Sequence, residues 1–224
     1  MKPDDEFTRG WAAGDGNVIQ NLGFGCAIPH VVWVDATGKV LYDQVLVAQS
    51  GGAYLLPVHR PSGKIALVRA IRAVVKDMEA YRRQWQAIDP KNADQVRQFV
   101  LDCSDMCRFS WEVPRGMAQK WESLAKAGKR EGQEETRYRL TGNPASLGPI
   151  NGDTTFFPHL NEGFWCELEL SATDVPEDKL EGIGPCKLVS LAEFDQMVDS
   201  QEIICAPTET VLRRFERRNP GVLR

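Results

Sequence analysis

The chain has 224 residues, of which 42% are hydrophobic and 26% are charged, and its formal net charge is −4. These values are ordinary for a globular protein with a buried core. A slightly acidic chain without a basic patch does not fit a general nucleic-acid binder or a protein that binds anionic membranes. Phosphate-bearing small molecules remain compatible with this charge if a metal ion lies between them and the protein.

No transmembrane or targeting signal stands out in the sequence. No segment is apolar over the length that spans a bilayer, and the first residues, MKPDDEFTRGWAAGDG, lack the basic-then-apolar order of a signal peptide. The six cysteines are scattered and form no zinc-like spacing with the three histidines. We therefore expect a cytoplasmic protein that contacts no membrane and keeps most of its cysteines as core thiols.

The first third of the chain is predicted to be mostly sheet. Residues 1–28 form a polar, glycine-containing arm, and residues 30–49 alternate β-branched and polar residues around a Thr-Gly turn, which is typical of a hairpin. The next two strands, AYLLPVH and KIALVRAIR, are separated by the turn RPSG. The run ALVRAI is apolar enough for a central strand.

The rest of the chain is predicted to alternate helices and strands within one domain, residues 29–224. Residues 73–107 form a charged helical insert, in which a helix starts at Asp89-Pro90. A short strand and loop, RFSWEVPRG, precede a helix that runs from about Glu122 to Tyr138. The remaining segments are the strands GFWCELELS and CKLVSL and the helices SLAEFDQMVDS and PTETVLRRFERR. The order predicts the α/β class, in its α+β form.

Three glutamates in the central helix favour a metal site. Glu131, Glu134 and Glu135 stand at i, i+3 and i+4, so their side chains share one face. Such carboxylates repel one another unless a cation lies among them, and Mg²⁺ binds few carboxylates together with water and substrate phosphates. We expect Arg130 to brace one of them rather than Glu122, two turns away. A solvated acidic helix face is the alternative.

The segment GMAQKWESLAKAGKREGQEETRY, residues 116–138, resembles the box of the Nudix hydrolases, G-x5-E-x7-R-E-U-x-E-E-x-G-U, where U is bulky and apolar. Gly116, Glu122, Arg130 and the three glutamates stand at the required positions. The preceding WEVPRG matches the Glu-x-Pro-x-Gly loop of that family. The resemblance implies an α/β/α sandwich with a mixed sheet and a Mg²⁺-dependent hydrolase of phosphoric anhydrides, in which Mn²⁺ can substitute.

Two positions depart from the box. Gly132 stands where a bulky apolar residue is usual, and we expect it to give up a core anchor and to cost about 1 kcal/mol relative to Ala. Arg137 stands where glycine is usual and adopts a left-handed cap less readily, so we expect the helix to continue through Tyr138.

The resemblance also implies roles for single residues. Glu131, Glu134 and Glu135 would bind the metal, together with the backbone carbonyl of Arg115. The catalytic set would consist of Glu134, Glu162 and Arg130. Glu162 or a box glutamate such as Glu134 would accept a proton, and Arg130 would fix the loop and helix that carry the ligands, a structural role it shares with Glu122.

The strand before the box resembles the branch of the family that cleaves ADP-ribose and nucleoside diphosphate sugars. On that comparison Arg69 or Arg72 would contact phosphate, and Glu112 would hold the nucleoside or part of the metal shell. Glu162 lies in the matching loop, FPHLNEGFW. The alternatives are surface arginines at positions 69 and 72 and an ordinary loop acid at position 162.

The expected ligand is therefore a nucleoside diphosphate derivative, with ADP-ribose or a nucleotide sugar favoured. Nucleoside triphosphates, dinucleotides and coenzyme A derivatives remain open as substrates, and so does a module of the same fold that binds nucleotide without hydrolysis. By analogy with the family we also expect a homodimer formed through the N-terminal arm and first strands.

Overall fold

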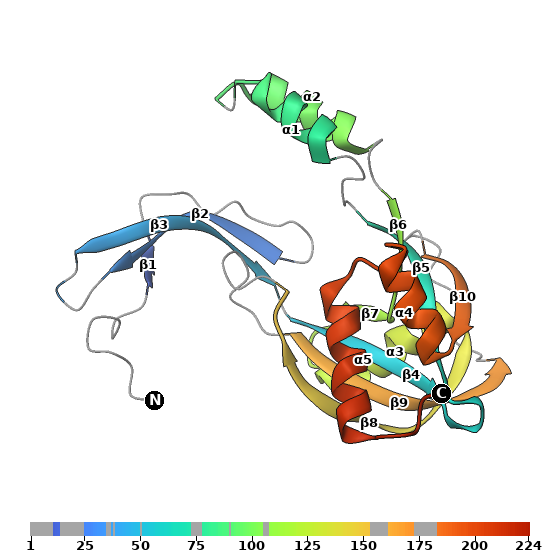
Figure 1. Cartoon of the computed structure of the whole chain (residues 1–224). Coiled ribbons are helices and arrows are strands. Elements are labelled where there is room, and N and C mark those ends of the chain that lie inside the picture. The colour runs from blue at the N-terminus through green and yellow to red at the C-terminus, as the bar shows by residue number, and fades with distance from the viewer. Residues whose placement is uncertain are drawn as a thin grey trace.

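A seven-stranded mixed sheet organises the computed structural model, which describes residues 11–13, 25–34, 37, 39–49, 51–72, 78–89, 91–104, 108–152, 161–172 and 183–224 (Figure 1). Five strands follow the order β10-β5-β4-β9-β8, and β6 and β7 pair with β5 and β4. Only β4 and β9 run parallel among these pairs, which makes the sheet mixed. The strands are β4 (Gly52–His59), β5 (Lys64–Arg72), β6 (Arg108–Glu112), β7 (Arg115–Met117), β8 (Tyr138–Ile150), β9 (Asn161–Ala172) and β10 (Ile183–Val189).

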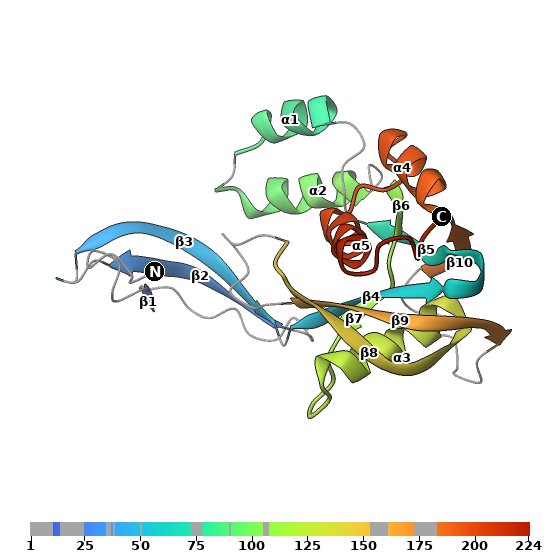
Figure 2. The same cartoon turned by 60° about the horizontal axis from the view of Figure 1, so that its bottom comes forward.

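Helices cover both faces of this sheet. Figure 2 shows α3 (Leu124–Thr136) below the sheet, and α4 (Leu191–Asp199) and α5 (Ala206–Arg218) above it. The predicted α/β/α sandwich with a mixed sheet is therefore confirmed. The predicted turn between β4 and β5 is a short 3₁₀ helix, Arg60–Ser62, that ends at Gly63.

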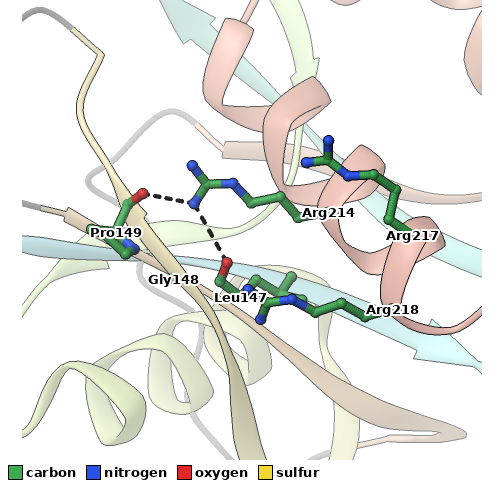
Figure 3. Close-up of a pocket in the computed structure, with 6 residues that line it drawn as sticks. All are labelled: Leu147, Gly148, Pro149, Arg214, Arg217 and Arg218. Carbon is green, nitrogen blue, oxygen red and sulfur yellow. Dashed lines mark hydrogen bonds between the residues drawn. The ribbon is translucent and has the colours of Figure 1, made fainter.

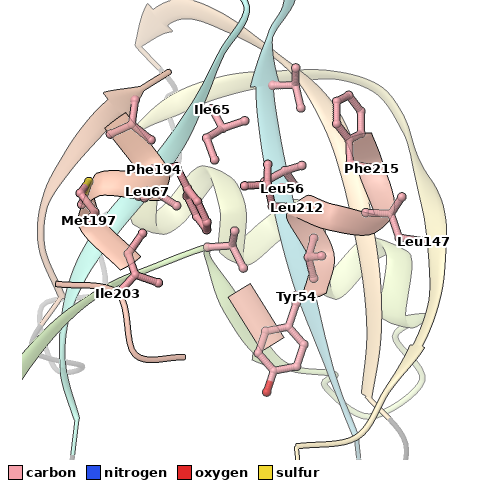
Figure 4. Packing of buried hydrophobic residues seen from close by; sticks show 14 of the residues in the cluster. Tyr54, Leu56, Ile65, Leu67, Leu147, Phe194, Met197, Ile203, Leu212 and Phe215 are labelled. Atoms are coloured by element: carbon pink, nitrogen blue, oxygen red, sulfur yellow. The ribbon is translucent and has the colours of Figure 1, made fainter. Parts of the chain in front are cut away.

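Two hydrophobic cores hold the layers together. The larger core, between the sheet and helices α4 and α5, includes Tyr54, Leu56, Phe194 and Phe215 (Figure 4). The smaller core lies between the sheet and α3. It consists of Ala53, Leu55, Ala66, Leu140, Phe164, Cys166 and Leu168. Successive residues of β4 thus enter opposite cores, which explains why this strand is a continuous apolar run rather than an alternating one.

A second, three-stranded sheet lies to one side of the main sheet in both views (Figures 1 and 2). Its strands are β1 (Trp11–Ala13), β2 (Gly25–Val34) and β3 (Val40–Gln49), all antiparallel. The hairpin predicted over residues 30–49 is therefore present and begins five residues earlier. The division into an arm, residues 1–28, and a domain, residues 29–224, stays a prediction.

The helical insert is present between β5 and β6 as α1 (Met78–Gln86) and α2 (Ala93–Ser104). The ring of Phe99 packs against the rings of Tyr81 and Trp85, with centroids 5.1 and 5.3 Å apart. The predicted helix start at Asp89-Pro90 is wrong by three residues, since Asn92 Oδ1 accepts hydrogen bonds from the first turn of α2. Pro90 itself lies outside the described residues.

The longest strand, β8, was not predicted from the sequence. Its sequence YRLTGNPASLGPI contains glycine, asparagine and proline, which are depleted in strands. The position of β8 at the edge of the sheet explains the exception, because an edge strand leaves one row of backbone groups unpaired and tolerates proline there. No helix in the described ranges is long and apolar enough to cross a membrane.

Candidate functional site

The box residues lie in one loop–helix unit beside the middle of the sheet. α3 begins after Ser123, whose side chain accepts a hydrogen bond from the Lys126 N–H at 3.4 Å. Glu122 therefore precedes the helix, and the prediction that the helix includes it is wrong. The serine cap explains the difference, because a side chain that satisfies the first free N–H groups fixes where a helix starts.

The helix also ends earlier than predicted. Arg137 is the C-cap with φ 63° and ψ 12°, a left-handed conformation, and its N–H donates to Gln133 O. The expectation that the helix continues through Tyr138 is therefore wrong, because Tyr138 already begins β8. Arginine takes the backbone conformation that the box usually assigns to glycine, at a local conformational cost.

Gly132 allows α3 to lie very close to the sheet. A Cβ atom at this position would lie 2.4 Å from Leu55 Cδ2 and 2.8 Å from Leu140 Cδ1. The leucines of the strands fill the space that a bulky helix residue would take. The core anchor expected to be lost is thus supplied from the sheet.

Arg130 is the centre of the polar network. Its guanidinium contacts Glu122 through two hydrogen bonds of 3.1 Å, Glu131 at 2.8 Å and Glu134 at 3.0 Å. Arg130 braces Glu131 and Glu134, as expected, and it also reaches Glu122, because Glu122 lies in the loop before the helix and not two turns away on it. Hydrogen bonding to Arg130 lowers the pKa of Glu122. Burial opposes the charged form of Arg130, but the pKa of Arg130 is raised by Glu122 and Glu131.

The two buried glutamates of α3 face the loop that contains β7. The carboxyl group of Glu131, 8% exposed, lies so close to Gly116 that a Cβ atom there would be 2.0 Å from Glu131 Cδ. Glu135, 9% exposed, accepts a hydrogen bond of 3.3 Å from the Arg115 N–H through Oε2. The glycine of the box is therefore required for the approach of loop and carboxylate.

The side chain of Arg115 contacts a further buried acid, Glu112. Its Nε lies 3.3 Å from Glu112 Oε2, and its Nη1 donates to Tyr54 Oη at 3.5 Å. Glu112 is 1% exposed. Burial lowers the pKa of Arg115, but Glu112, Cys205 and Tyr54 together outweigh burial, and the pKa is raised. Burial raises the pKa of Tyr54.

A shallow cavity of about 130 Å³ opens beside this loop. Tyr54 and Asn161 line the cavity but were not predicted as site residues from the sequence. Asn161 lies in the segment FPHLNEGFW, from which Glu162 was predicted. Asn161 Oδ1 accepts a hydrogen bond of 2.7 Å from the Gly52 N–H. The lining residues are Gly52, Ala53, Tyr54, Arg115, Gly116, Met117 and Asn161.

Arg69 and Glu162, two residues predicted for the site, lie outside this network of described contacts. Arg69 stacks on Phe109, with the guanidinium carbon 4.1 Å from the ring centroid. It pairs in register with Trp111, which packs on the core under α4 and α5, so its side chain points to the face opposite α3. Arg72 ends β5, and its side chain is not among those described.

Glu162 is the second residue of β9 and lies in a strand rather than in the predicted loop. Ser146 on β8 donates its hydroxyl to the Glu162 carboxylate. The roles assigned from sequence to Arg69, Arg72 and Glu162 stay predictions.

Comparison with known proteins tests the fold. No protein-family model matches the sequence, and no curated protein matches it. A solved structure described as the crystal structure of an ADP compounds hydrolase is similar over 95% of this chain and 96% of that one, with a TM-score of 0.60. The chain shares that fold. At 12% sequence identity the likeness shows nothing beyond the fold.

The donor chemistry of the site fits a hard divalent cation. Glu131, Glu134 and Glu135 supply only oxygen, the ligand that Mg²⁺ and Mn²⁺ prefer. Arg130 contacts one oxygen of Glu131 and one of Glu134, and each carboxylate has a second oxygen that can accept another partner. Among the residues that the structure describes, no group of three or more His, Cys, Asp or Glu side chains gathers closely enough to hold an ion.

Proposed function

We propose that this chain is a Mg²⁺-dependent hydrolase of the Nudix type that cleaves the diphosphate of a nucleoside diphosphate linked to another group. The observation that carries the proposal is the convergence of the box. Loop residue Gly116, the buried carboxylates of Glu131 and Glu135, and the Arg130 network meet in one unit. The shared fold with an ADP compounds hydrolase supports the same reaction class.

Glu131, Glu134 and Glu135 would hold the cation, with the backbone carbonyl of Arg115 as a further ligand. A bound divalent cation would neutralise the diphosphate and lower the pKa of an attacking water. Arg130 keeps the carboxylates of Glu131 and Glu134 together despite their like charge. Arg130 also ties the helix to Glu122 and to the Met117 carbonyl, so it positions the ligands rather than touching the substrate.

The base that accepts the proton from the attacking water is Glu162 or Glu134 in this proposal. Ser146 donates its hydroxyl to one oxygen of the Glu162 carboxylate, and the other oxygen can accept the proton. Glu134 already accepts a hydrogen bond from Arg130. A comparison of pH–rate profiles for Glu162→Gln and Glu134→Gln assigns the base, because only loss of the base removes the acid limb.

ADP-ribose or a nucleotide sugar is the favoured substrate, in line with the branch that the strand before the box resembles. Glu112 would act through Arg115, which it holds, rather than by touching the nucleoside. Arg69 and Arg72 remain the proposed phosphate contacts, and Arg69 would have to leave the ring of Phe109 to reach the α3 side.

The decisive experiment measures release of nucleoside monophosphate from ADP-ribose, nucleotide sugars, NADH, dinucleoside polyphosphates and nucleoside triphosphates, with Mg²⁺ or Mn²⁺. Glu135→Gln keeps an oxygen acceptor for the Arg115 N–H but removes the charge. We expect it to lower kcat/KM by about 10²-fold or more and to weaken Mn²⁺ binding in calorimetry. Glu169→Gln, at an exposed position of β9, is the control. Unchanged turnover and unchanged Mn²⁺ affinity in Glu135→Gln would contradict the proposal.

The alternative of nucleotide binding without hydrolysis rested on Gly132 and Arg137. Gly132 is needed for the packing of α3 on Leu55, and Arg137 provides the left-handed cap. No described feature therefore favours that alternative. Tight binding of ADP-ribose without cleavage in the same screen would support it.

A homodimer through the N-terminal arm and first strands remains part of the proposal. The three-stranded sheet β1-β2-β3 is separate from the main sheet, with β1 and β3 as its edge strands, and strand edges readily pair with another chain. Light scattering after size-exclusion chromatography at micromolar concentration would give twice the chain mass, and a monomer would contradict this part.

A further inference from the structure

Three arginines of α5 line a cavity far along the chain from the glutamates. Arg214, Arg217 and Arg218 stand at i, i+3 and i+4 and so share one face of the helix, next to the edge strand β8 (Figure 3). The cavity has a volume of about 230 Å³, and its other walls are Leu147, Gly148 and Pro149.

An irregularity in β8 brings the strand's carbonyl groups to these arginines. Arg214 Nη1 donates to Pro149 O at 2.6 Å and to Leu147 O at 3.4 Å, and Arg218 Nη1 donates to Ser146 O at 2.7 Å. In a regular strand, successive carbonyls point to opposite sides. Here the register shifts between Ser146 and Gly148, and Gly148 has φ +96°, so neighbouring carbonyls reach the same helix.

These contacts fix the arginines but do not neutralise them. A carbonyl oxygen accepts a hydrogen bond without a net charge, and a guanidinium has five N–H donors, so each bound arginine keeps donors and its full charge. Arg217 makes no hydrogen bond or ion pair with any described residue, and none of the three arginines pairs with a carboxylate in the described ranges. Arg213 of the same helix contrasts with them, since it pairs with Asp195 and Glu216.

Two simpler explanations account for part of this arrangement. Basic residues in the last turn of a helix interact well with its dipole, which explains Arg217 and Arg218 but not Arg214, one turn earlier. Covering the edge of β8 protects it from pairing with other strands, which explains Arg214 and Arg218 but not Arg217. Neither explanation accounts for three guanidinium groups around one cavity.

We propose that Arg214, Arg217 and Arg218 form a binding site for the phosphate or diphosphate group of a small molecule. Planar guanidinium donors match phosphate oxygens well. The cavity is smaller than the roughly 300–1,000 Å³ typical of pockets that enclose a drug-sized ligand, so it takes the phosphate group and leaves the rest of the molecule in solvent. The site is separate from the proposed hydrolytic site and does not depend on it.

The test uses the full chain and inorganic pyrophosphate in EDTA, because without divalent ions the glutamates repel the anion. Calorimetry at low ionic strength should show binding that weakens as NaCl is added, as for charge-dominated contacts. Arg217→Gln should weaken the affinity about tenfold and leave the unfolding temperature unchanged. Arg213→Gln, which removes a positive charge from the same helix, should weaken it less than twofold.

A second pair of measurements distinguishes a phosphate group carried by a nucleotide from a free phosphate anion. ADP and orthophosphate replace pyrophosphate in parallel titrations. Similar affinity for ADP and pyrophosphate, lost together in Arg217→Gln, supports a phosphate group carried by a nucleotide; binding of pyrophosphate alone supports the free anion. Equal affinity of Arg217→Gln and the unaltered chain for all three anions, or an equal loss in Arg213→Gln, would overturn the proposal. Arg214→Lys should also weaken binding, because lysine lacks the planar fork.

Discussion

The guanidinium of Arg130 binds the carboxylate of Glu122 at two points, Nε to Oε1 and Nη2 to Oε2, both at 3.1 Å. This pair connects the loop before α3 to the middle of the helix. Because both side chains are largely buried, at 25% and 15% exposure, their interaction is less screened by solvent than a surface pair.

We expect Arg130→Lys to destabilise the fold, because an ammonium group cannot reproduce the two-point contact with Glu122 and the contacts to Glu131 and Glu134. The expected loss is about 1–3 kcal/mol in the free energy of unfolding, measured by urea denaturation. Arg139→Lys is the control, since Arg139 forms only an exposed pair of 3.9 Å with Glu169. Equal losses in the two variants would contradict the central role of Arg130.

Acid should weaken this same pair. Hydrogen bonding to Arg130 holds the pKa of Glu122 below its ordinary value of 4.5. The stabilisation is therefore complete above the pKa of the unfolded chain and is lost as the pH falls through the lower, folded pKa. Urea unfolding between pH 3 and 7 should show that Glu122→Gln has a shallower loss of stability below about pH 4.5 than the unaltered chain. If the two proteins lost stability equally steeply as the pH falls, Glu122 would contribute nothing to the pH dependence of stability.

Gly116→Ala should affect the proposed metal site more than the fold. The new methyl group would displace the carboxylate of Glu131, which is the flexible end of a side chain. We expect Mn²⁺ affinity to fall about 10–100-fold in calorimetry, as for residues that orient metal ligands. Gly152→Ala, whose methyl group would meet only Pro207 at 3.9 Å, should leave the affinity unchanged. Normal Mn²⁺ binding by Gly116→Ala would refute this positioning of Glu131.

Gly132→Ala should destabilise the protein although alanine is the better helix former by about 1 kcal/mol. The added methyl group would collide with Leu55 and Leu140, which are buried. Shortening one partner should relieve the collision, so Leu55→Val should cost less in the Gly132→Ala background than alone. A double-mutant cycle in urea measures this coupling, and additive effects would rule out the contact.

Arg137→Gly should stabilise the chain, because glycine adopts the left-handed C-cap without the strain that arginine bears. We expect a gain of about 0.5–1 kcal/mol, which raises the Tm by about 1–4 °C for a chain of this size. Arg139→Gly, two residues later within β8, should instead lower the Tm. An unchanged or lower Tm for Arg137→Gly would contradict the backbone strain inferred at this cap.

The sequence by itself determined the elements that depend on local spacing. The i, i+3, i+4 pattern places Glu131, Glu134 and Glu135 on one face of α3, and alternation identified the hairpin and β9. The strand β8 was not predicted because its prolines and glycines are tolerated only at a sheet edge, and edge position is a property of the whole sheet.

Tertiary structure decided the contacts between segments distant in sequence. Glu122 reaches Arg130 only because a cap at Ser123 turns the chain out of the helix. Gly132 fits only because leucines of two strands approach it, and the arginines of α5 surround a cavity only because β8 shifts its register. Local spacing fixes which side chains share a face, whereas the approach of two faces depends on the packing of the complete core.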